Sequence, residues 1–280
     1  MILIDANQIS ISHLMVRNKI EGKIDIDTIR KSVVRLVGRK AKQFRDEYGE
    51  VVLCYDDKDY WRREVFPYYK QNRKQEREQS PIDWENVFSV LNKLRDEFRE
   101  NFPYRVIQVQ GAEADDVIAS LCIHNSKKVE PENILILSAD KDFIQLHKFD
   151  FVKQYDPVNH QYITNENPIQ FLREHIIRGD RSDGIPNILT SDDSIVKNKP
   201  QKRMSQEKIK TLAEMSPESF TNYVRTRNWK RNDQLINFDN IPQEVVDRIL
   251  SVYYHKKPKS SISLEYFSQH NITDILGDFA

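Results

Sequence analysis

The sequence predicts an α/β fold, in which helices flank a central, mostly parallel sheet and a helical region follows. Three observations support this prediction. Short apolar runs alternate with longer segments of helical periodicity, as in parallel strands joined by helices. The runs are apolar at consecutive positions, which indicates strands buried on both faces. After about residue 165 these runs fade while helical stripes continue. We therefore expect an α/β domain over residues 1–164 and a helical region over residues 165–280.

The composition fits a soluble globular protein, with 31% charged and 39% hydrophobic residues. No apolar run approaches the roughly 20 residues of a membrane span. The start, MILIDANQ, lacks the features of a signal peptide. Cys54 and Cys122 lie within apolar stretches, so we expect buried, reduced thiols. Together these observations predict a cytoplasmic protein with no membrane partner.

The predicted strands follow one another through the first half of the chain. Most are continuous apolar runs, and the third alternates between apolar and polar residues. In parallel sheets the functional site lies off the carboxyl ends of the strands. The predicted strands are residues 1–5, 51–55, 104–109, 134–137 and 151–155.

The helices are predicted from periodicity and from capping residues. Ser80-Pro81 is expected to open a helix, with serine as the N-cap and proline in the first turn. Asn167-Pro168 is expected to start a helix that runs to Arg178, and the polar segment 190–201 is expected to be a loop. Further helices are predicted over residues 26–47, around Val117–Cys122, after the N-caps Ser205 and Ser216, and around Val245–Tyr253.

Nine acidic residues occur in a fixed order, mostly where apolar runs stop. Asp5, Asp56 and Asp140 each sit at the carboxyl end of a predicted strand, so they would meet at one edge of the sheet. Carboxylates repel one another, and a fold that gathers them needs cations such as Mg²⁺ or Mn²⁺. Sites of this kind most often act on phosphate esters. The nine are Asp5, Asp56, Glu113, Asp115, Asp116, Asp140, Asp142, Asp180 and Asp183.

The spacing of these residues supports a shared site. Asp140 and Asp142 are two apart, which places them on one side of extended backbone. Helix capping is the alternative for any single motif, and we expect Asp116 to cap a helix or to support the other residues. The same spacing argument applies to Glu113 with Asp115, before a helix, and to Asp180 with Asp183, on one face of a helical turn. None of the seven histidines pairs at metal-ligand spacing, so His124, His147 and His175 are expected to be surface or core residues.

Basic residues are unevenly distributed, although 43 basic and 43 acidic residues give a net charge of zero. Residues 60–77 mix aromatic and basic side chains, and Lys70 and Arg73 would share one face of a helix there. Such a face can clamp a phosphate while aromatic rings stack on bases. A solvated amphipathic surface is the alternative. A second basic stretch spans residues 197–210.

These ordered motifs resemble the flap endonuclease, or 5′ nuclease, superfamily, and within it the ribonuclease H branch of T-even bacteriophages. The resemblance implies a PIN-like catalytic domain over residues 1–164, with an arch region at about residues 58–80, and a DNA-binding region over residues 165–280. The glycine-rich turn of the family is missing after the last aspartates, so we expect a modified helix-hairpin-helix. The motifs are LID, VVLCYD with YWRR and YYKQNR, AEADDVIA, ILSADKDFIQLHK, IIRGDRSD and INFDNIP.

The resemblance implies a metal-dependent 5′→3′ exonuclease and flap endonuclease. Such an enzyme hydrolyses phosphodiester bonds in RNA–DNA and DNA duplexes and removes RNA primers during lagging-strand DNA replication. Two Mg²⁺ ions are implied, for which Mn²⁺ can substitute. By position, one ion is assigned to Asp5, Asp56, Glu113 and Asp115, and the other to Asp142, Asp180 and Asp183, with Asp140 between the two.

The arch region implies further roles. Lys70 and Arg73 match the part of the arch that contacts the scissile phosphate, so they are the predicted catalytic residues. The predicted nucleic-acid contacts are Arg62, Arg63, Tyr69, Lys74, Lys197, Lys199, Lys202 and Arg203.

Forked or flapped DNA and RNA–DNA hybrid are the expected partners, and we also consider a sliding clamp and a single-strand-binding protein. The C-terminal pattern Gln269, Ile272, Ile275 and Leu276 is either a clamp-binding peptide or an ordinary terminal helix face. Two alternatives to the nuclease stay open. One is a non-catalytic nucleic-acid-binding module with a vestigial acidic site, and the other is a phosphatase acting on small phosphoesters.

Overall fold

The structure is a computed structural model that describes residues 1–18, 25–220 and 223–279, and in this part of the chain six strands form one sheet. The strands are β1 (Ile2–Asp5), β2 (Val51–Tyr55), β3 (Arg105–Gln108), β4 (Ile134–Leu137), β5 (Val152–Asp156) and β6 (Gln161–Ile163). Their order is β3-β2-β1-β4-β5-β6, and β6 pairs antiparallel with β5 while the other neighbours are parallel. Ile2 lies opposite Val51 of β2 and Leu135 of β4. The sheet is therefore mostly parallel, as predicted.

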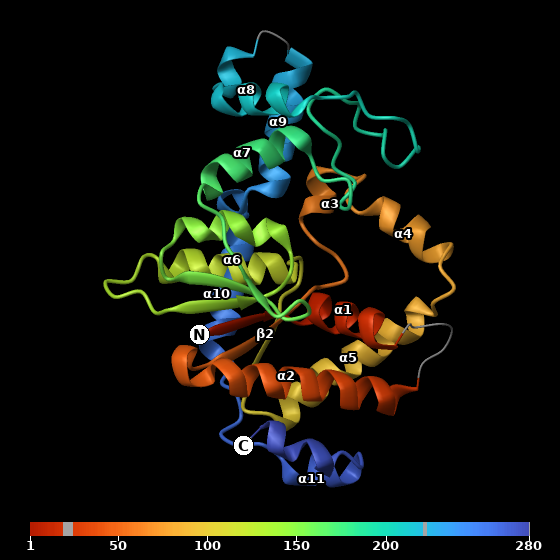
Figure 1. The fold of residues 1–280 in the computed structure, drawn as a ribbon, viewed down its shortest axis with the longest axis vertical. Coiled ribbons are helices and arrows are strands. Elements are labelled where there is room, and N and C mark those ends of the chain that lie inside the picture. Colours follow the sequence, from red (N-terminus) through yellow and green to blue (C-terminus); the bar gives the residue numbers. More distant parts are fainter. Residues whose placement is uncertain (19–24, 221–222, 280) are drawn as a thin grey trace.

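Helices cover both faces of the sheet, because successive side chains of a strand point to opposite sides. They are α1 (Ala6–Asn18), α2 (Ile26–Tyr48) and α5 (Trp84–Asn101) on one face, and α6 (Ala114–Asn125) and α10 (Gln243–His255) on the other. Ile2 and Ile4 pack toward the first group, whereas Leu3 packs toward the second. Figure 1 shows the two groups on either side of the strands.

Two more helical groups lie beyond the sheet. The arch region, residues 58–80, contains α3 (Arg62–Val65) and α4 (Gln71–Glu78). The other group contains α7 (Pro168–Arg178), α8 (Gln206–Glu214) and α9 (Tyr223–Ile236), which stack at the top of Figure 1. Phe66 and Tyr69 of the arch region pack against Ile176 of α7 and Leu235 of α9. Three short 3₁₀ segments connect these elements: η1 (Lys141–Lys148) between β4 and β5, η2 (Pro217–Ser219) before α9 and η3 (Phe238–Asn240) after α9.

The C-terminal segment packs on α2. It consists of α11 (Leu264–Gln269) and η4 (Thr273–Asp278). Ile272 and Ile275 are buried in the same apolar core as α2 and α5. Asp274 and Asp278 form ion pairs with the α2 residues Lys31, Arg35 and Arg39. This burial favours a terminal helix face over a clamp-binding peptide.

Most predicted elements occur where the pattern placed them. β2, β4 and α7 have the predicted bounds, and Asn167 caps α7 through Gln170 N at 3.0 Å. The prediction that a helix opens at Ser80 is wrong, because α5 begins at Trp84 with Asp83 as its N-cap. The Asp83 carboxylate accepts a hydrogen bond from Asn86 N at 3.0 Å and so fixes the start of the helix.

Other elements were missed or are smaller than expected. α1 and the edge strand β6 were not predicted. Ser216 precedes only the three-residue segment η2 and makes no side-chain capping bond. Cys54 and Cys122 are buried free thiols, as predicted. None of the helices in the described ranges is long and apolar enough to cross a membrane.

The topology fixes where a site can form. β1 lies at the centre, with β2 on one side and β4 on the other. Connections therefore leave β1 and β4 toward opposite faces of the sheet, which in such folds marks the functional site; the space beyond these strand ends, where the acidic side chains gather, is called the crevice from here on. Asp5, Asp56 and Asp140 lie at this edge.

Candidate metal centre

The ends of β1 and β2 place the first two acidic side chains at the crevice. Asp5, the last residue of β1, is 5% exposed, and its Oδ1 accepts a hydrogen bond from Gln8 N at 3.1 Å. Asp56 follows β2, and its Oδ1 accepts a hydrogen bond from Ala114 N at 2.8 Å. Backbone N–H groups in the first turns of α1 and α6 thus orient both carboxylates.

The carboxylates in this crevice repel one another. Burial and then Asp56 raise the pKa of Asp5 to about 8. Burial, followed by Asp140 and Asp5, raises the pKa of Asp115 well above its usual value. Burial also raises the pKa of Asp140, and nearby Asp183 adds to the effect. A buried set of oxygen donors that is short of positive charge fits hard divalent cations.

Glu113 is held by the arch region. It is the N-cap residue of α6 and is 1% exposed. It accepts hydrogen bonds from Arg62 Nη1 at 2.9 Å, Tyr69 OH at 3.0 Å and Lys70 Nζ at 2.5 Å. Burial alone would raise its pKa, but Lys70 and Arg62 lower the pKa of Glu113 to about 2. Asp116 lies behind it, fully buried, and pairs with Arg62 at 2.8 Å. This position fits the supporting role predicted for Asp116.

Asp183 is the second carboxylate that the arch region contacts. It is 8% exposed, and its Oδ2 accepts a hydrogen bond from Tyr69 OH at 2.9 Å and lies 3.5 Å from Lys70 Nζ. Its Oδ1 pairs with the Arg73 guanidinium. Lys70 therefore lies between Glu113 and Asp183, with its charge shared between the two sides of the crevice.

The backbone holds the arch region against the turn that carries Asp183. Lys70 adopts a left-handed conformation with φ of +56°, and its N–H donates to Asp183 O at 2.8 Å. Gly184 also has a positive φ, and a Cβ there would lie 2.9 Å from Tyr68 O. Glycine at this position lets the turn approach the arch closely.

Asp142, His175 and Asp180 form a separate triad. Among the described residues they are the one group of three potential ligands whose atoms all lie within 4.8 Å of one another. His175 Nδ1 is 3.4 Å from Asp142 Oδ1, and His175 Nε2 is 3.4 Å from Asp180 Oδ2. Burial and then Asp140 raise the pKa of Asp142 to about 8. His175 was expected to be a surface or core histidine, and the structure places it between two of the predicted metal ligands. Its position in the last turn of α7, just before the GDRSD motif, was the available signal.

The residues predicted to bind the first ion lie less close together. Asp5, Asp56, Glu113 and Asp115 surround the crevice, yet in the described ranges no three of them approach as closely as the triad does. Glu113 is drawn away by its three hydrogen bonds to the arch region. Assembly of this half of the centre would require Glu113 to exchange some of these bonds for an ion.

The spacing arguments need correction, because capping geometry brings each pair together. Asp140 is the N-cap of η1, and its Oδ1 accepts a hydrogen bond from Asp142 N at 2.9 Å, so the pair is not extended. Asp180 Oδ1 accepts from Asp183 N at 3.1 Å within a turn, not along a helical face. Glu113 is the N-cap of α6 and Asp115 lies in its first turn, so this pair is not in extended backbone either, and the capping box joins Glu113 with Asp116.

The predicted nucleic-acid contacts divide into buried and exposed residues. Arg62 is 3% exposed and Tyr69 is 2% exposed, so both serve the packing of Glu113 in this conformation and offer no surface to a strand. Arg63 lies over the Tyr60 ring at 4.4 Å and stays exposed, as do Lys74, Lys197, Lys199, Lys202 and Arg203. Lys197 and Lys199 each pair with Asp193, at 2.7 and 3.5 Å.

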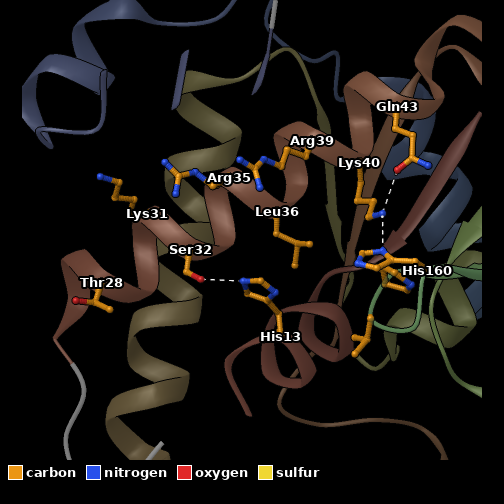
Figure 2. Close-up of a pocket in the computed structure, with 12 residues that line it drawn as sticks. His13, Thr28, Lys31, Ser32, Arg35, Leu36, Arg39, Lys40, Gln43 and His160 are labelled. Atoms are coloured by element: carbon orange, nitrogen blue, oxygen red, sulfur yellow. Dashed lines mark hydrogen bonds between the residues drawn. The ribbon is translucent and has the colours of Figure 1, made fainter. Parts of the chain in front are cut away.

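A second hollow lies on the α2 face, away from the acidic residues. This cavity of about 600 Å³ lies between α1, α2 and the turn after β5, and Figure 2 shows its lining. Lys40, which is 6% exposed, donates to Gln43 Oε1 at 3.0 Å and contacts His160 Nδ1 at 3.3 Å. Burial lowers the pKa of Lys40. None of the described residues that line this cavity is acidic, so these residues are unsuited to a cation.

Two protein-family models cover the chain between them. The 5′-3′ exonuclease N-terminal resolvase-like domain matches residues 1–173. The C-terminal domain of T4 RNase H matches residues 169–279. The first match spans the sheet and its acidic edge, and the second spans α7 to η4.

Known proteins are similar over different lengths. The ribonuclease H of Enterobacteria phage T4 is 31% identical over 287 residues, covering 98% of this chain and 92% of that protein. The flap endonuclease Xni of Shewanella oneidensis is 33% identical over 147 residues, covering 49% of this chain and 52% of that protein.

Solved structures share the fold at low sequence identity. A complex of the phage T5 flap endonuclease with DNA and metal ions has a TM-score of 0.60 and 18% identity, covering 91% of this chain and 99% of that one. The T5 5′-exonuclease with bound zinc has a TM-score of 0.58 and 17% identity, covering 100% and 99%. With both family models and a full-length relative in agreement, the chain belongs to the 5′-3′ exonuclease and flap endonuclease family, in the branch of T4 ribonuclease H.

Proposed function

We propose that this nuclease is a divalent-metal-dependent 5′→3′ exonuclease and flap endonuclease that removes RNA primers during lagging-strand replication. Its substrates would be forked or flapped DNA and RNA–DNA hybrid. The observation that carries the proposal is the gathering of buried carboxylates, with raised pKa values at Asp5, Asp115, Asp140 and Asp142, beside the cationic arch region. Full-length similarity to a ribonuclease H supports the assignment to primers.

The acidic side chains are assigned to two Mg²⁺ ions, for which Mn²⁺ can substitute. Bound divalent ions would supply the charge that activates water and stabilises the departing oxygen. Asp5, Asp56, Glu113 and Asp115 are assigned to one ion, and Asp142, Asp180 and Asp183 to the other, with Asp140 between them. The capping hydrogen bonds to Asp5, Asp56 and Asp180 hold these carboxylates in fixed orientations.

Lys70 and Arg73 are assigned to the scissile phosphate. Both now pair with carboxylates of the crevice, at Glu113 and Asp183. When cations neutralise those carboxylates, the two side chains become available to charge that develops on phosphoryl oxygens. The exposed residues Arg63, Lys74, Lys202 and Arg203 would then position the strand through its backbone phosphates.

The test is the variant Asp140→Asn, which removes one negative charge at the centre of the crevice with little change in size. We expect loss of Mg²⁺-dependent cleavage of a 5′-labelled forked duplex, with binding of that duplex preserved. Unchanged turnover would rule out the metal assignment. Wild-type protein that binds the fork but never cleaves it would indicate the non-catalytic module. Hydrolysis of p-nitrophenyl phosphate without cleavage of DNA would indicate the phosphatase.

Substrate and partner preferences need their own assays. Cleavage of RNA–DNA hybrid, nicked duplex and forked duplex by the same preparation would rank the three substrates. For a sliding clamp or a single-strand-binding protein, pull-down with and without residues 269–280 is the direct experiment. Because Ile272 and Ile275 are buried, we expect the full-length protein to bind the clamp as weakly as the protein that lacks residues 269–280.

A further inference from the structure

His175 lies between two acidic residues, with one ring nitrogen facing each. Nδ1 is 3.4 Å from Asp142 Oδ1, Nε2 is 3.4 Å from Asp180 Oδ2, and the His175 side chain is 14% exposed. The Phe171 ring packs edge-on against the imidazole, with 5.9 Å between ring centroids. The ring is thus held in place by α7 and points both nitrogens into the crevice.

One ligand atom from each of Asp142, His175 and Asp180 lies within 4.8 Å of the other two, so a small closing movement brings the three around one ion. Donors that each lie about 2.1 Å from a cation are about 3 to 3.5 Å from their neighbours. The Asp180 side is also prepared: its Oδ1 accepts hydrogen bonds from Ser182 N and Ser182 Oγ, both at 2.7 Å. This leaves Oδ2, the oxygen nearer His175, for the ring or for an ion.

We propose that His175 supplies an imidazole nitrogen to the ion held by Asp142 and Asp180. Its other ring nitrogen would donate a hydrogen bond to the carboxylate that it already faces, as metal-bound histidines commonly do. The site would then have mixed nitrogen and oxygen ligands, unlike the all-carboxylate half formed by Asp5, Asp56 and Asp115. Imidazole ligands favour Zn²⁺ and similar transition metals, whereas Mg²⁺ favours oxygen ligands alone. The inference rests on the proposed metal dependence and adds to it the ligand and the ion preference.

A purely structural role for His175 is the competing explanation. In that case the ring only bridges Asp142 and Asp180 by hydrogen bonds, and no nitrogen contacts an ion. The two explanations differ in an observable that does not require catalysis, namely the coupling between a nitrogen nucleus and a bound paramagnetic ion.

The experiment uses full-length protein that is stripped of metals and loaded with Mn²⁺ alone. Electron spin-echo envelope modulation of the wild type should show coupling to a directly bound ¹⁴N nucleus. Labelling histidine with ¹⁵N should convert the pattern to that of ¹⁵N. The variant His175→Asn should abolish the nitrogen coupling. The control His124→Asn should keep it, because His124 lies on α6 and contacts Tyr254 OH of α10 at 2.7 Å. The isotope comparison needs no variant, so it stands even if His175→Asn folds poorly.

Each result has a defined meaning. Bound Mn²⁺ without nitrogen coupling overturns the role of His175 and leaves the metal-dependent nuclease intact. Failure to bind Mn²⁺ at all contradicts the proposed metal dependence itself. Calorimetric titration adds a second readout: His175→Asn should weaken Zn²⁺ binding about 10-fold or more and affect Mg²⁺ binding much less. Equal losses for both ions would mean that His175 only orients its neighbours.

Discussion

Lys70 lies between Glu113 and Asp183, and this position keeps its ammonium group charged. Burial alone would lower its pKa, but Asp183 and Glu113 together hold the pKa of Lys70 well above its usual value. A permanently charged group that already faces the crevice is suited to electrostatic stabilisation, because it needs little reorganisation when phosphate arrives.

Lys70→Ala should therefore slow the chemical step by about 10²-fold or more. Single-turnover cleavage at saturating enzyme measures this step directly. Lys93→Ala is the control, since Lys93 is exposed on α5, outside the arch region. If Lys70→Ala changes only the salt dependence of binding, Lys70 is a backbone clamp and not a catalytic group.

Lys40 provides a prediction about pH. Its contacts are Gln43, His160 and the Tyr155 ring, none of which carries a negative charge at neutral pH. Because burial lowers its folded-state pKa, protonating Lys40 opposes folding below that pKa, and the cost disappears as the pH rises toward the unfolded value.

Lys40→Met should consequently stabilise the protein at neutral pH. A gain of about 1 kcal/mol would raise the thermal midpoint by about 2 to 4 °C. The difference from the wild type should shrink as the pH approaches about 10.4. Thermal unfolding followed by circular dichroism at several pH values measures both effects, and a wild type that is more stable than Lys40→Met at neutral pH would contradict the argument.

Sequence patterns found the acidic residues but not all of their partners. Asp5, Asp56 and Asp140 were identified because each sits at the carboxyl end of a strand, which is a local signal. Arg62, Tyr69 and His175 could not be placed in the same way. Their contacts join segments far apart in the chain, such as Arg62 with Leu235 O at 2.8 Å, and only the packed arch and α7 create them.

N-cap residues of short helices determine where several acidic side chains point. Glu113 opens α6 and Asp140 opens η1, and in both cases the cap also contributes to the crevice. Such caps were predictable where one candidate stood alone, as with Asn167 and Ser205. The prediction was wrong at Ser80 because Asp83, three residues later, is the residue that caps the helix.

The C-terminal element gives a test of its structural role. Ile275→Ala should reduce the free energy of unfolding by about 2 to 5 kcal/mol, because Ile275 is 1% exposed in the core beneath η4. Asp274→Asn should change stability little, since Asp274 pairs on an exposed surface. Urea unfolding compares the two. An Ile275→Ala protein that is as stable as the wild type would restore the clamp-peptide interpretation.

Across the whole molecule, one of the two basic stretches lies apart from the acidic crevice. The acidic crevice lies at the edge of the sheet, while Lys197 to Arg203 lie in the segment between α7 and α8. The α/β class, the mostly parallel sheet and the helical second half could all be predicted, because periodicity repeats within each element. The packing of the arch onto α7 and α9 through Phe66 and Tyr69 could not, because it depends on three separate segments.

Within the segment between α7 and α8 we expect two kinds of basic residue: those available to DNA phosphates and those already paired with Asp193. Lys202→Ala combined with Arg203→Ala should lower the slope of log binding constant against log salt by up to about 1.8, or 0.9 per lost phosphate contact. Lys197→Ala combined with Lys199→Ala should lower it less, because both lysines already pair with Asp193. Fluorescence anisotropy with a forked duplex over a salt series measures the slopes. Equal slopes in both variants and the wild type would remove this segment from the DNA interface.

β1 lies between β2 and β4 in the sheet, so the site needs residues that are synthesised early together with residues that are synthesised late. A nascent chain that has left the ribosome as far as residue 130 contains Asp5, Asp56 and Asp115 but neither β4 nor the turn after α7. Because domains fold as units during synthesis, the crevice stays incomplete until about residue 185 is outside. Unfinished chains would therefore be inert toward the nucleic acids that surround them in the cell.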